Sequence, residues 1–244
     1  MTKLSVNLNK VALLRNQRDL DIPSVARAAH TCIDAGAHGI TVHPRPDGRH
    51  IRTADVVELA ALTRERGVEF NVEGYPAPEF LALVRQVRPD QCTLVPDAPG
   101  QRTSDHGWDV AARGDLLRPV IAELTDVGTR VSLFVDPDAG QMAAASAVGA
   151  ARVELYTEPY ARAYGTPREG EVVERYVRAT AAAGRCGLGL NAGHDLNLDN
   201  LGALCARIPT LLEVSIGHAL IADALFMGLA AAVEAYLRVL QGTP

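Results

Sequence analysis

Carboxylate and imidazole side chains recur along this chain at one kind of place, the end of a short apolar segment. Histidine titrates near neutral pH, and burial raises the pKa of a carboxylic acid toward the same range. Such groups can exchange protons with a substrate, although a carboxylate at such a place can also serve only in an ion pair with a neighbouring arginine. The candidate catalytic residues are His43, Glu73, Glu154 and His194.

A second group of residues is suited to binding anions. Gly193-His194 and Gly217-His218 each follow an apolar segment, and backbone N–H groups at such places commonly bind phosphate. Basic residues in the loops after the first two apolar segments could simply be solvated. Their concentration in one region of a chain with net charge −5 instead indicates a phosphorylated substrate. These basic residues are Lys10, Arg18, Arg45 and His50.

The segments that position these residues alternate between two periodicities. Short apolar runs predict strands, and longer runs with an apolar residue at every third or fourth position predict helices. The predicted strands span residues 3–8, 39–43, 69–73, 91–95, 130–135, 151–155, 187–191 and 213–216. The predicted helices span 24–34, 54–66, 77–87, 115–127, 138–148, 170–183, 199–206 and 219–240, with a short extra helix at 11–17 after the first strand.

Eight strands alternating with eight helices predict an α/β fold, a (β/α)8 TIM barrel that forms a single domain over residues 1–244. A barrel of this kind gathers the carboxyl ends of its strands at one mouth, where all the polar residues above would meet. A doubly wound open sheet would share the alternation. It is less favoured, because the chain has neither a G-x-G-x-x-G motif after its first strand nor a P-loop.

Composition restricts the class of protein further. Charges of both signs are scattered along an acidic chain, which argues against a nucleic-acid surface. No apolar run approaches the roughly 20 residues that a membrane helix needs, and the first residues lead into a strand without a signal-peptide pattern. We therefore expect a cytoplasmic enzyme that binds neither nucleic acid nor membrane. The four cysteines lie far apart in apolar patterns, which favours free thiols over disulfides or zinc ligands.

A series of short motifs occurs in order along almost the whole chain. They are VNLNK at 6–10, LRNQR at 14–18, GAHGITVHPR at 36–45, RHI at 49–51, LVP at 94–96, VSLFVD at 131–136, NAGH at 191–194 and IGHA at 216–219. Each motif alone is weak, but together they resemble the pyridoxine 5′-phosphate synthase family. The resemblance implies a β/α barrel that assembles into a homo-octamer and works without a metal or organic cofactor. It also implies condensation of 1-deoxy-D-xylulose 5-phosphate with 3-amino-2-oxopropyl phosphate, which releases inorganic phosphate and water.

The resemblance further implies roles for particular residues. His43, Glu73 and His194 would be the acid–base residues, and Glu154 would stabilise charge in the transition state. The residues that would hold the deoxyxylulose phosphate are Arg45, His50 and Thr103. Those that would hold the aminoketone phosphate are Asn7, Arg18, Gly217 and His218.

The chain departs from the commonest family pattern at three positions, all of which are expected to lie in the substrate site. Asn9 and Lys10 replace an Asp-His pair, and Asp195 replaces a glycine. An amide and a fixed cation therefore stand where an acid and an imidazole are usual. We expect these replacements to affect substrate binding more than the class of reaction.

Two other classes of function remain open from the residues alone. A metal-dependent barrel hydrolase would use His43, Glu73, His194 and His218 as ligands, but such enzymes usually carry His-x-His on the first strand, where this chain has Asn7-Leu8-Asn9. A non-catalytic barrel that binds a phosphorylated metabolite would need the Gly-His pairs but not Glu73 together with His43. An enzyme-bound Schiff base is not expected, because no lysine stands at a buried strand end.

Overall fold

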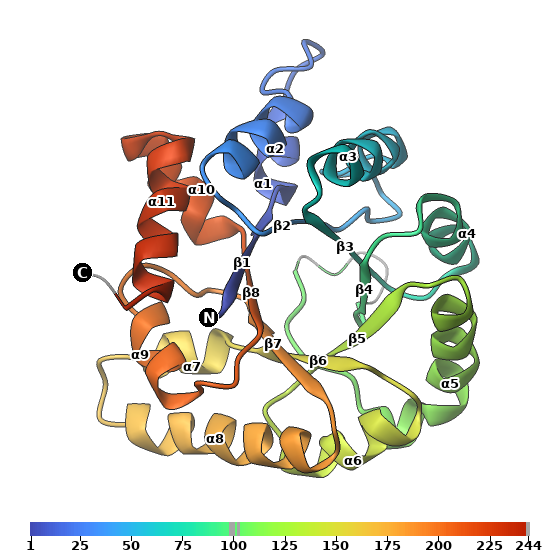
Figure 1. Ribbon diagram of the computed structural model, residues 1–244, viewed down its shortest axis with the longest axis vertical. Coiled ribbons are helices and arrows are strands. Elements are labelled where there is room, and N and C mark those ends of the chain that lie inside the picture. Colours follow the sequence, from blue (N-terminus) through green and yellow to red (C-terminus); the bar gives the residue numbers. More distant parts are fainter. Residues whose placement is uncertain (98–100, 102, 243–244) are drawn as a thin grey trace.

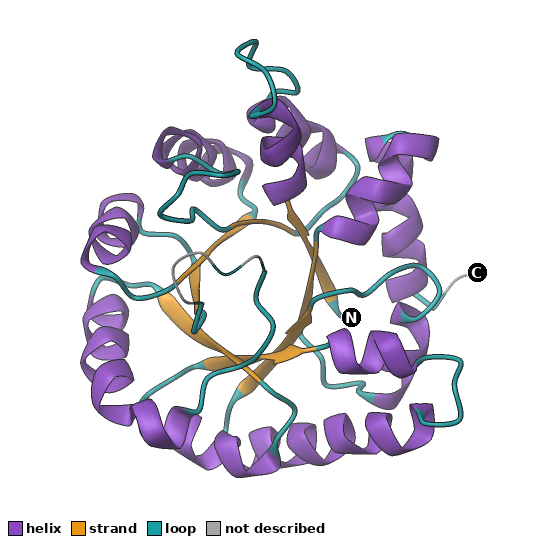
Figure 2. Cartoon of the chain, turned by 180° about the vertical axis from the view of Figure 1, so that it is seen from behind, coloured by secondary structure: helices purple, strands orange, loops and turns teal. Residues whose placement is uncertain are grey.

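The strands close into a barrel. The computed structural model describes residues 1–97, 101 and 103–242. Within them eight parallel strands pair in chain order, and the last strand pairs with the first. Figures 1 and 2 show this ring of strands from opposite sides, with helices around it. The strands are β1 (Lys3–Asn7), β2 (Gly39–Val42), β3 (Glu69–Gly74), β4 (Gln91–Leu94), β5 (Arg130–Val135), β6 (Arg152–Tyr156), β7 (Gly189–Gly193) and β8 (Glu213–Ile216).

Helices cover the outer face of the barrel. Those found in the described residues are α1 (Asn9–Arg15), α2 (Val25–Asp34), α3 (Thr53–Arg66), α4 (Pro78–Val87), α5 (Val110–Asp126), α6 (Ala139–Ala147), α7 (Glu158–Ala163), α8 (Glu169–Arg185), α9 (Leu201–Arg207), α10 (His218–Met227) and α11 (Leu229–Leu240). The sequence predicts the barrel, the short helix after β1 and each crossover helix, with bounds that differ by a few residues.

Two features of the helices differ from the prediction. The single helix expected over 219–240 is two helices, α10 and α11, because Gly228 between them has a φ of 86°, which lies outside the helical region. The short helix α7 is not predicted at all. Its six residues make fewer than two turns, too few to establish a helical periodicity in the sequence.

Alternate residues of each strand face the barrel interior, and most of these residues are polar. Gln91 of β4 donates a hydrogen bond to Glu213 of β8 at 3.3 Å, although these strands are not neighbours in the sheet. Thr93 of β4 likewise donates to Glu154 of β6 at 3.4 Å. Such contacts require side chains that point inward. Glu154 therefore faces the interior from the middle of β6, whereas the sequence analysis places it at the end of that strand.

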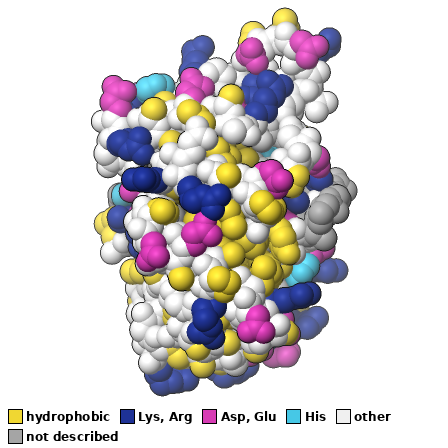
Figure 3. Space-filling view, turned by 90° about the vertical axis from the view of Figure 1, so that its right-hand side faces the viewer, with side chains coloured by type: hydrophobic (Ala, Val, Ile, Leu, Met, Phe, Trp, Pro, Cys, Tyr) yellow, Lys and Arg dark blue, Asp and Glu magenta, His cyan; other side chains and the backbone are white. Residues whose placement is uncertain are grey.

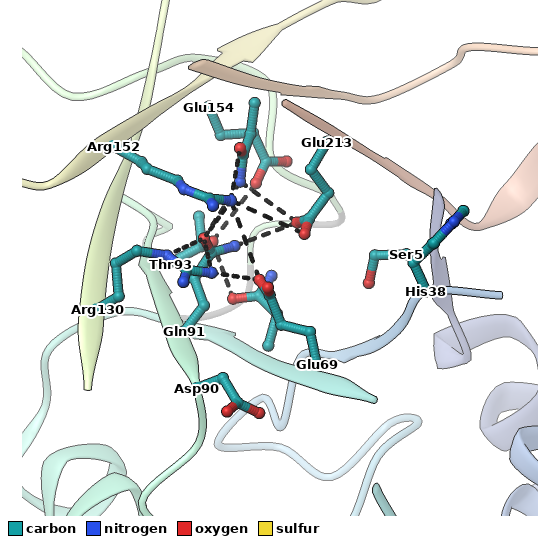
Figure 4. Close-up of polar contacts among 12 residues, drawn as sticks. Ser5, His38, Glu69, Asp90, Gln91, Thr93, Arg130, Arg152, Glu154 and Glu213 are labelled. Carbon is teal, nitrogen blue, oxygen red and sulfur yellow. Dashed lines mark hydrogen bonds and ion pairs between the residues drawn. The ribbon is translucent and has the colours of Figure 1, made fainter. Parts of the chain in front are cut away.

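A charged cluster fills the interior near the amino ends of the strands, and its side chains converge in Figure 4. Arg130 forms an ion pair with Glu69, and Arg152 lies 4.0 Å from Glu69 and 3.9 Å from Glu213. Burial raises the pKa of Glu213 to about 8, and the nearby charge of Glu69 adds to this effect. This end of the barrel is therefore filled by polar side chains, not by an apolar layer.

The main hydrophobic core lies between the outer face of the sheet and the helices. The outward-facing residues Leu4, Val6, Ile40 and Val42 are completely buried there. They alternate with the polar inward residues, so each strand has an apolar face toward the helices and a polar face toward the barrel interior. Burial of this apolar layer is the main force that holds the helices against the barrel.

On one side of the barrel, the surface carries charged side chains of both signs (Figure 3). Figure 3 shows them interspersed on the side of the barrel that bears α3, α4 and α5. No helix in the described part of the chain is long and apolar enough to cross a membrane. All four cysteines are free thiols, as expected; Cys32 and Cys92 are fully buried.

Candidate active site

A cavity of about 520 Å³ opens among the carboxyl ends of the strands. Residues from the ends of most strands line it, which is the arrangement that a barrel mouth produces. All but one of the site residues predicted from the sequence are in its lining. These are Asn7, Asn9, Lys10, His43, Arg45, His50, Glu73, Thr103, Glu154, His194, Asp195, Gly217 and His218.

The exception is Arg18. It is exposed in the loop between α1 and α2, and Figure 1 shows this loop projecting away from the barrel. The structure of one chain therefore does not bring Arg18 to the cavity. Its assignment to the aminoketone phosphate stays a prediction.

Two asparagines link the ends of the first three strands. The side-chain oxygen of Asn7 accepts a hydrogen bond from the backbone N–H of Asn9 at 2.9 Å, and that of Asn9 accepts from the backbone N–H of His43 at 2.9 Å. The amide nitrogen of Asn7 lies 3.5 Å from Oε2 of Glu73. These hydrogen bonds thus hold the backbone of His43 in a fixed position relative to Glu73.

Two carboxyl groups that point into the barrel, the half-buried Glu73 and the buried Glu154, line the cavity. Burial raises the pKa of Glu73 well above its ordinary value, and the charge of Glu154 raises it further. Burial also raises the pKa of Glu154 to about 7, against the opposing effect of the hydrogen bond from Thr93. The backbone of β7 approaches Glu154 closely, since a Cβ on Gly193 would lie 2.5 Å from Oε1. Glu154 can therefore exchange a proton near neutral pH, and Glu73 holds its proton to a higher pH than an ordinary glutamate.

Two histidines, His43 and His50, line the same cavity, with ring centroids 6.1 Å apart. Burial lowers the pKa of His43 well below its ordinary value, and Arg45 and His50 contribute in the same direction. Burial, Arg45 and Lys10 lower the pKa of His50 to about 4. Nδ1 of His50 accepts a hydrogen bond from the backbone N–H of Ile51 at 2.9 Å, so the neutral ring carries its proton on Nε2. Both rings are neutral at pH 7.

His194 lies across the cavity, where side chains from three segments surround its ring. Nε2 is 3.1 Å from Oγ1 of Thr103, and Nδ1 is 3.2 Å from Oδ2 of Asp195. The ring of Tyr156 meets that of His194 edge-on, with centroids 5.1 Å apart. Thr103 belongs to the loop after β4, so this contact joins the fourth and seventh strand ends.

The guanidinium group of Arg45 is already engaged by protein groups. It forms a buried ion pair with Asp97 and donates a hydrogen bond to the backbone oxygen of Gln101 at 3.0 Å. Arg49 donates to the same oxygen at 3.0 Å. Ser104 donates to Asp97 at 2.9 Å. Asp97 is thus a partner of the site that sequence reasoning missed.

The sequence does contain a signal for Asp97. It is a polar residue that closely follows β4, and the candidates that were recognised occupy the same kind of position after their own strands. Arg49, Phe134 and Ser215 also line the cavity and were not predicted. Ser215 could be found from the alternation of inward residues along β8. The position of Arg49 depends on the shape of its loop, which no sequence pattern specifies.

The start of α10 supplies a different kind of group. Gly217 precedes this ten-residue helix and makes no side-chain cap, so the first backbone N–H groups of α10 remain available for an anion. A Cβ on Gly217 would lie 3.1 Å from Cβ of Asn7, which explains the glycine. In the part of the chain that the structure describes, no three His, Cys, Asp or Glu side chains are grouped to hold a metal ion.

Comparison with known proteins gives a consistent family. The family model described as "Pyridoxal phosphate biosynthesis protein PdxJ" matches residues 4–242. A pyridoxine 5′-phosphate synthase of Albidiferax ferrireducens is 56% identical over 97% of this chain and 96% of its own length. Proteins of the same name are 54% identical in Xanthomonas oryzae pv. oryzae, over 99% and 98% of the two chains, and in Xylella fastidiosa, over 98% and 95%.

Solved structures with a similar fold are much more distant in sequence. A tryptophan synthase from M. tuberculosis matches with a TM-score of 0.68 at 14% identity, over 98% of this chain and 93% of that chain. A thiamine phosphate pyrophosphorylase from Pyrococcus furiosus matches with a TM-score of 0.60 at 13% identity, over 99% and 96%. At this identity the likeness concerns the fold alone.

Proposed function

Since this chain belongs to the PdxJ family of pyridoxal phosphate biosynthesis proteins, we propose that the cavity at its barrel mouth is the active site of a pyridoxine 5′-phosphate synthase. The enzyme condenses 1-deoxy-D-xylulose 5-phosphate with 3-amino-2-oxopropyl phosphate and forms pyridoxine 5′-phosphate, inorganic phosphate and water. A hydrolase or a non-catalytic barrel, the two classes left open by the residues alone, does not account for the match along residues 4–242.

One observation supports this location of the site above all others. Two carboxyl groups with raised pKa, Glu73 and Glu154, and a neutral histidine, His43, line one cavity together with Lys10, Arg45 and the start of α10, which could bind anions. The reaction needs repeated proton transfers between two phosphorylated substrates. Groups that titrate near neutrality can serve several such steps, and phosphate groups bound on both sides would hold the reacting atoms together.

The proposed roles are those that the family resemblance implies, and they agree with the direction of the pKa shifts of His43, Glu73 and Glu154. The amine of the aminoketone adds to the carbonyl of the deoxyxylulose substrate, and loss of water gives a Schiff base between the substrates. Neutral His43 accepts a proton from the attacking amine, while Glu73 in its acid form protonates the departing oxygen. His194 moves protons in the later ring closure, and Glu154 stabilises the positive charge that develops on nitrogen. Glu154 can hold or release a proton near neutral pH, because its pKa is raised to about 7, and the raised pKa of Glu73 lets it keep the proton that it donates.

Substrate binding is assigned to two sides of the cavity. The deoxyxylulose phosphate is bound by Arg45, His50 and Thr103, with Lys10 and Asn9 beside it. For Arg45 to bind a phosphate, it must exchange at least one of its contacts to Asp97 and residue 101 for the phosphate oxygens. The aminoketone phosphate is bound by Asn7, Gly217 and His218, with Asp195 at the edge and Arg18 as a further predicted ligand.

We also propose that the chain assembles into a homo-octamer, as the resemblance implies. Large apolar side chains at the end of α10 support association, since Leu225 is 72% exposed and Phe226 is 93% exposed. Light scattering on the purified protein tests the number of copies. The cytoplasmic location expected from the sequence also stays a prediction.

A product assay tests the proposed function directly. Purified protein that has been treated with a chelator is incubated with both phosphorylated substrates, and pyridoxine 5′-phosphate and inorganic phosphate are measured. We expect the two products in equal amounts, and none when either substrate is omitted. Activity that disappears on chelation and returns with zinc would favour the metal-dependent alternative. Binding of a substrate without any product would favour the non-catalytic barrel.

A further inference from the structure

Two consecutive residues after β7 adopt backbone angles that side chains normally disfavour. His194 has a φ of 93° and Asp195 a φ of 58°. Glycine is the usual residue in this region, and a residue with a Cβ is strained there. Aspartate tolerates it better than most residues, but the chain still places a carboxylate where a glycine would fit without strain. The backbone oxygen of Asp195 accepts a hydrogen bond from Asn200 at 3.2 Å, a contact that a glycine could make equally well.

The carboxylate of Asp195 faces an unsatisfied atom of its neighbour. Nδ1 of His194 is buried and has no hydrogen-bond partner among the described residues. Oδ2 of Asp195 lies 3.2 Å away, within ion-pair distance but without the alignment of a hydrogen bond. A small rotation of the Asp195 side chain, which is 43% exposed, would complete that bond. The other ring nitrogen, Nε2, faces Thr103 and the cavity.

We propose that Asp195 is a positioning residue for His194. Its carboxylate accepts the Nδ1 proton of the neutral imidazole, so that the lone pair of Nε2 faces the substrate. Proton transfer then takes place at Nε2, and the Nδ1–H bond is unchanged by it. This inference rests on the acid–base role proposed for His194, and it gives Asp195 a function that does not involve contact with the substrate.

The charges around the pair favour this arrangement. His194 lowers the pKa of Asp195, and His218 and Lys10 lower it further, so Asp195 is ionised at neutral pH. The remaining titratable neighbours of His194 come from β6: Glu154, whose pKa His194 lowers, and Tyr156, whose ring it meets. Lys10 also offsets the negative charge of Asp195, which would otherwise repel phosphate groups at the mouth.

The test uses a substitution that the backbone favours. Asp195→Gly removes the carboxylate and relieves the strain at φ 58°, so the variant is expected to fold at least as well as the parent. Asp195→Asn keeps an acceptor of the same shape without the charge. Arg88→Gly is the matched control, because Arg88 is another exposed residue at positive φ, at the opposite end of the barrel.

Kinetics of the full enzyme provide the first readout. We expect Asp195→Gly to lower kcat by roughly 10-fold, a part of the 10²–10⁴-fold that a positioned acid–base group contributes, without raising KM for either substrate. Asp195→Asn is expected to lower kcat by a smaller factor, and Arg88→Gly is expected to leave kcat unchanged. An unchanged kcat in Asp195→Gly, or a raised KM with the same kcat, would overturn the proposal in favour of a surface charge or a substrate contact.

The second readout does not depend on turnover. Solid-state ¹⁵N spectra of histidine-labelled enzyme at pH 8 report which ring nitrogen carries the proton, and His194→Gln identifies the signal of His194. We expect a proton on Nδ1 in the parent and on Nε2 in Asp195→Gly. The same tautomer in both would overturn the proposal. If the tautomer changed but the parent enzyme made no product, the proposed function would be refuted. The pairing of Asp195 with His194 would still be supported.

Discussion

The side chains of Glu73 and Glu154 obtain their proton-transfer ability from their surroundings. Each has its pKa raised mainly by burial, and the charge of Glu154 raises that of Glu73 further. A carboxyl group on the surface would be ionised at pH 7 and could act only as a weak base. The barrel interior therefore makes both glutamates hold their protons to a higher pH than an exposed carboxyl group, and it brings the pKa of Glu154 to about 7.

The assignment of Glu73 and His43 as acid–base residues predicts a large loss of turnover when either group can no longer exchange a proton. Glu73→Gln and His43→Asn keep approximate size, so the fold should be retained. Each is expected to reduce kcat by roughly 10²-fold or more, the usual contribution of a general acid or base. Steady-state kinetics and circular dichroism check this together. Near-normal turnover in both variants would contradict the assignment.

Lys10 is predicted to bind the phosphate of the deoxyxylulose substrate and to help it leave, because a fixed cation stabilises the charge on a departing phosphate. Lys10→Ala should weaken use of that substrate by about 1.5–3 kcal/mol, the scale of a hydrogen bond to a charged group, with little effect on the aminoketone phosphate. Lys10→His should recover part of the loss, and less as pH rises through the ordinary imidazole pKa.

The chain's only other lysine, Lys3, supplies the control for this prediction. It begins β1 at the opposite end of the barrel, so Lys3→Ala should leave both kinetic constants unchanged. Separate kcat/KM values for the two substrates are the measurement. Unchanged values for the deoxyxylulose phosphate in Lys10→Ala would make Lys10 a solvated surface charge.

At the scale of elements, the short helix α1 shows how a distant segment positions the site. Arg15 at its end forms a buried ion pair with Asp55 and donates to the backbone oxygen of His50 at 3.2 Å. Asn16 donates to the same oxygen at 2.8 Å. The loop that bears His50 is therefore held by the residues that follow β1. This is a physical reason for the LRNQR motif at 14–18, which the sequence reveals only as a pattern.

The loop between β4 and α5 is fixed at its end by a close approach to β5. The N–H of Trp108 donates to the oxygen of Phe134 at 2.9 Å, and its indole donates to that of Leu94 at 2.9 Å. A Cβ on Gly107 would lie 2.1 Å from the backbone nitrogen of Asp136. The backbone cannot yield as a flexible side chain would, so any side chain at 107 must displace this loop.

Gly107→Ala should therefore lower the free energy of unfolding by about 1–3 kcal/mol, the usual cost of forcing an extra group into a packed site. Gly170→Ala is the control, because a Cβ there meets open space in the first turn of α8. That variant should be as stable as the parent or up to about 1 kcal/mol more stable. Urea unfolding of all three proteins measures both effects. Equal stability of the parent and Gly107→Ala would mean that the loop moves freely.

The sequence predicts the architecture and most of the site, because both depend on local patterns. Alternating periodicities locate all eight strands, and the rule of polar residues at strand ends locates the cavity lining. The same rule misplaces Glu154, since a polar residue inside a strand also interrupts the apolar run. Contacts such as Arg45 with Asp97 depend on how two loops meet. No pattern within either loop contains that information.

For the whole molecule, the carboxyl groups inside the barrel link stability to pH. The pKa of Glu213 is raised to about 8 and that of Glu154 to about 7, so the folded state holds protons that the unfolded state has already lost. Such groups stabilise the fold most at low pH and lose that effect as pH rises through the folded pKa. His43 and His50 oppose this trend only below the ordinary pKa of histidine, about 6.5.

Between pH 7 and pH 9 the free energy of unfolding should therefore fall, by about 1 kcal/mol from Glu213 alone. Glu213→Gln keeps an oxygen to accept the bonds from Gln91 and Asn191 but cannot titrate, so its stability should fall less over the same range. Denaturant midpoints at the two pH values, compared between parent and variant, measure the difference. If the free energy of unfolding fell equally in both proteins, a group other than Glu213 would be responsible for the pH dependence.

The pairing of β1 with β8 has a consequence for the synthesis of the chain on the ribosome. Synthesis makes β1 first, but its partner residues 213–216 and the anion-binding start of α10 come almost last. The ring of strands can close only after residues 213–216 have been made, because β8 supplies the edge that pairs with β1. The cavity, whose lining includes Asn7 at the end of β1 and Ser215 of β8, is therefore complete only when nearly the whole chain has been synthesised.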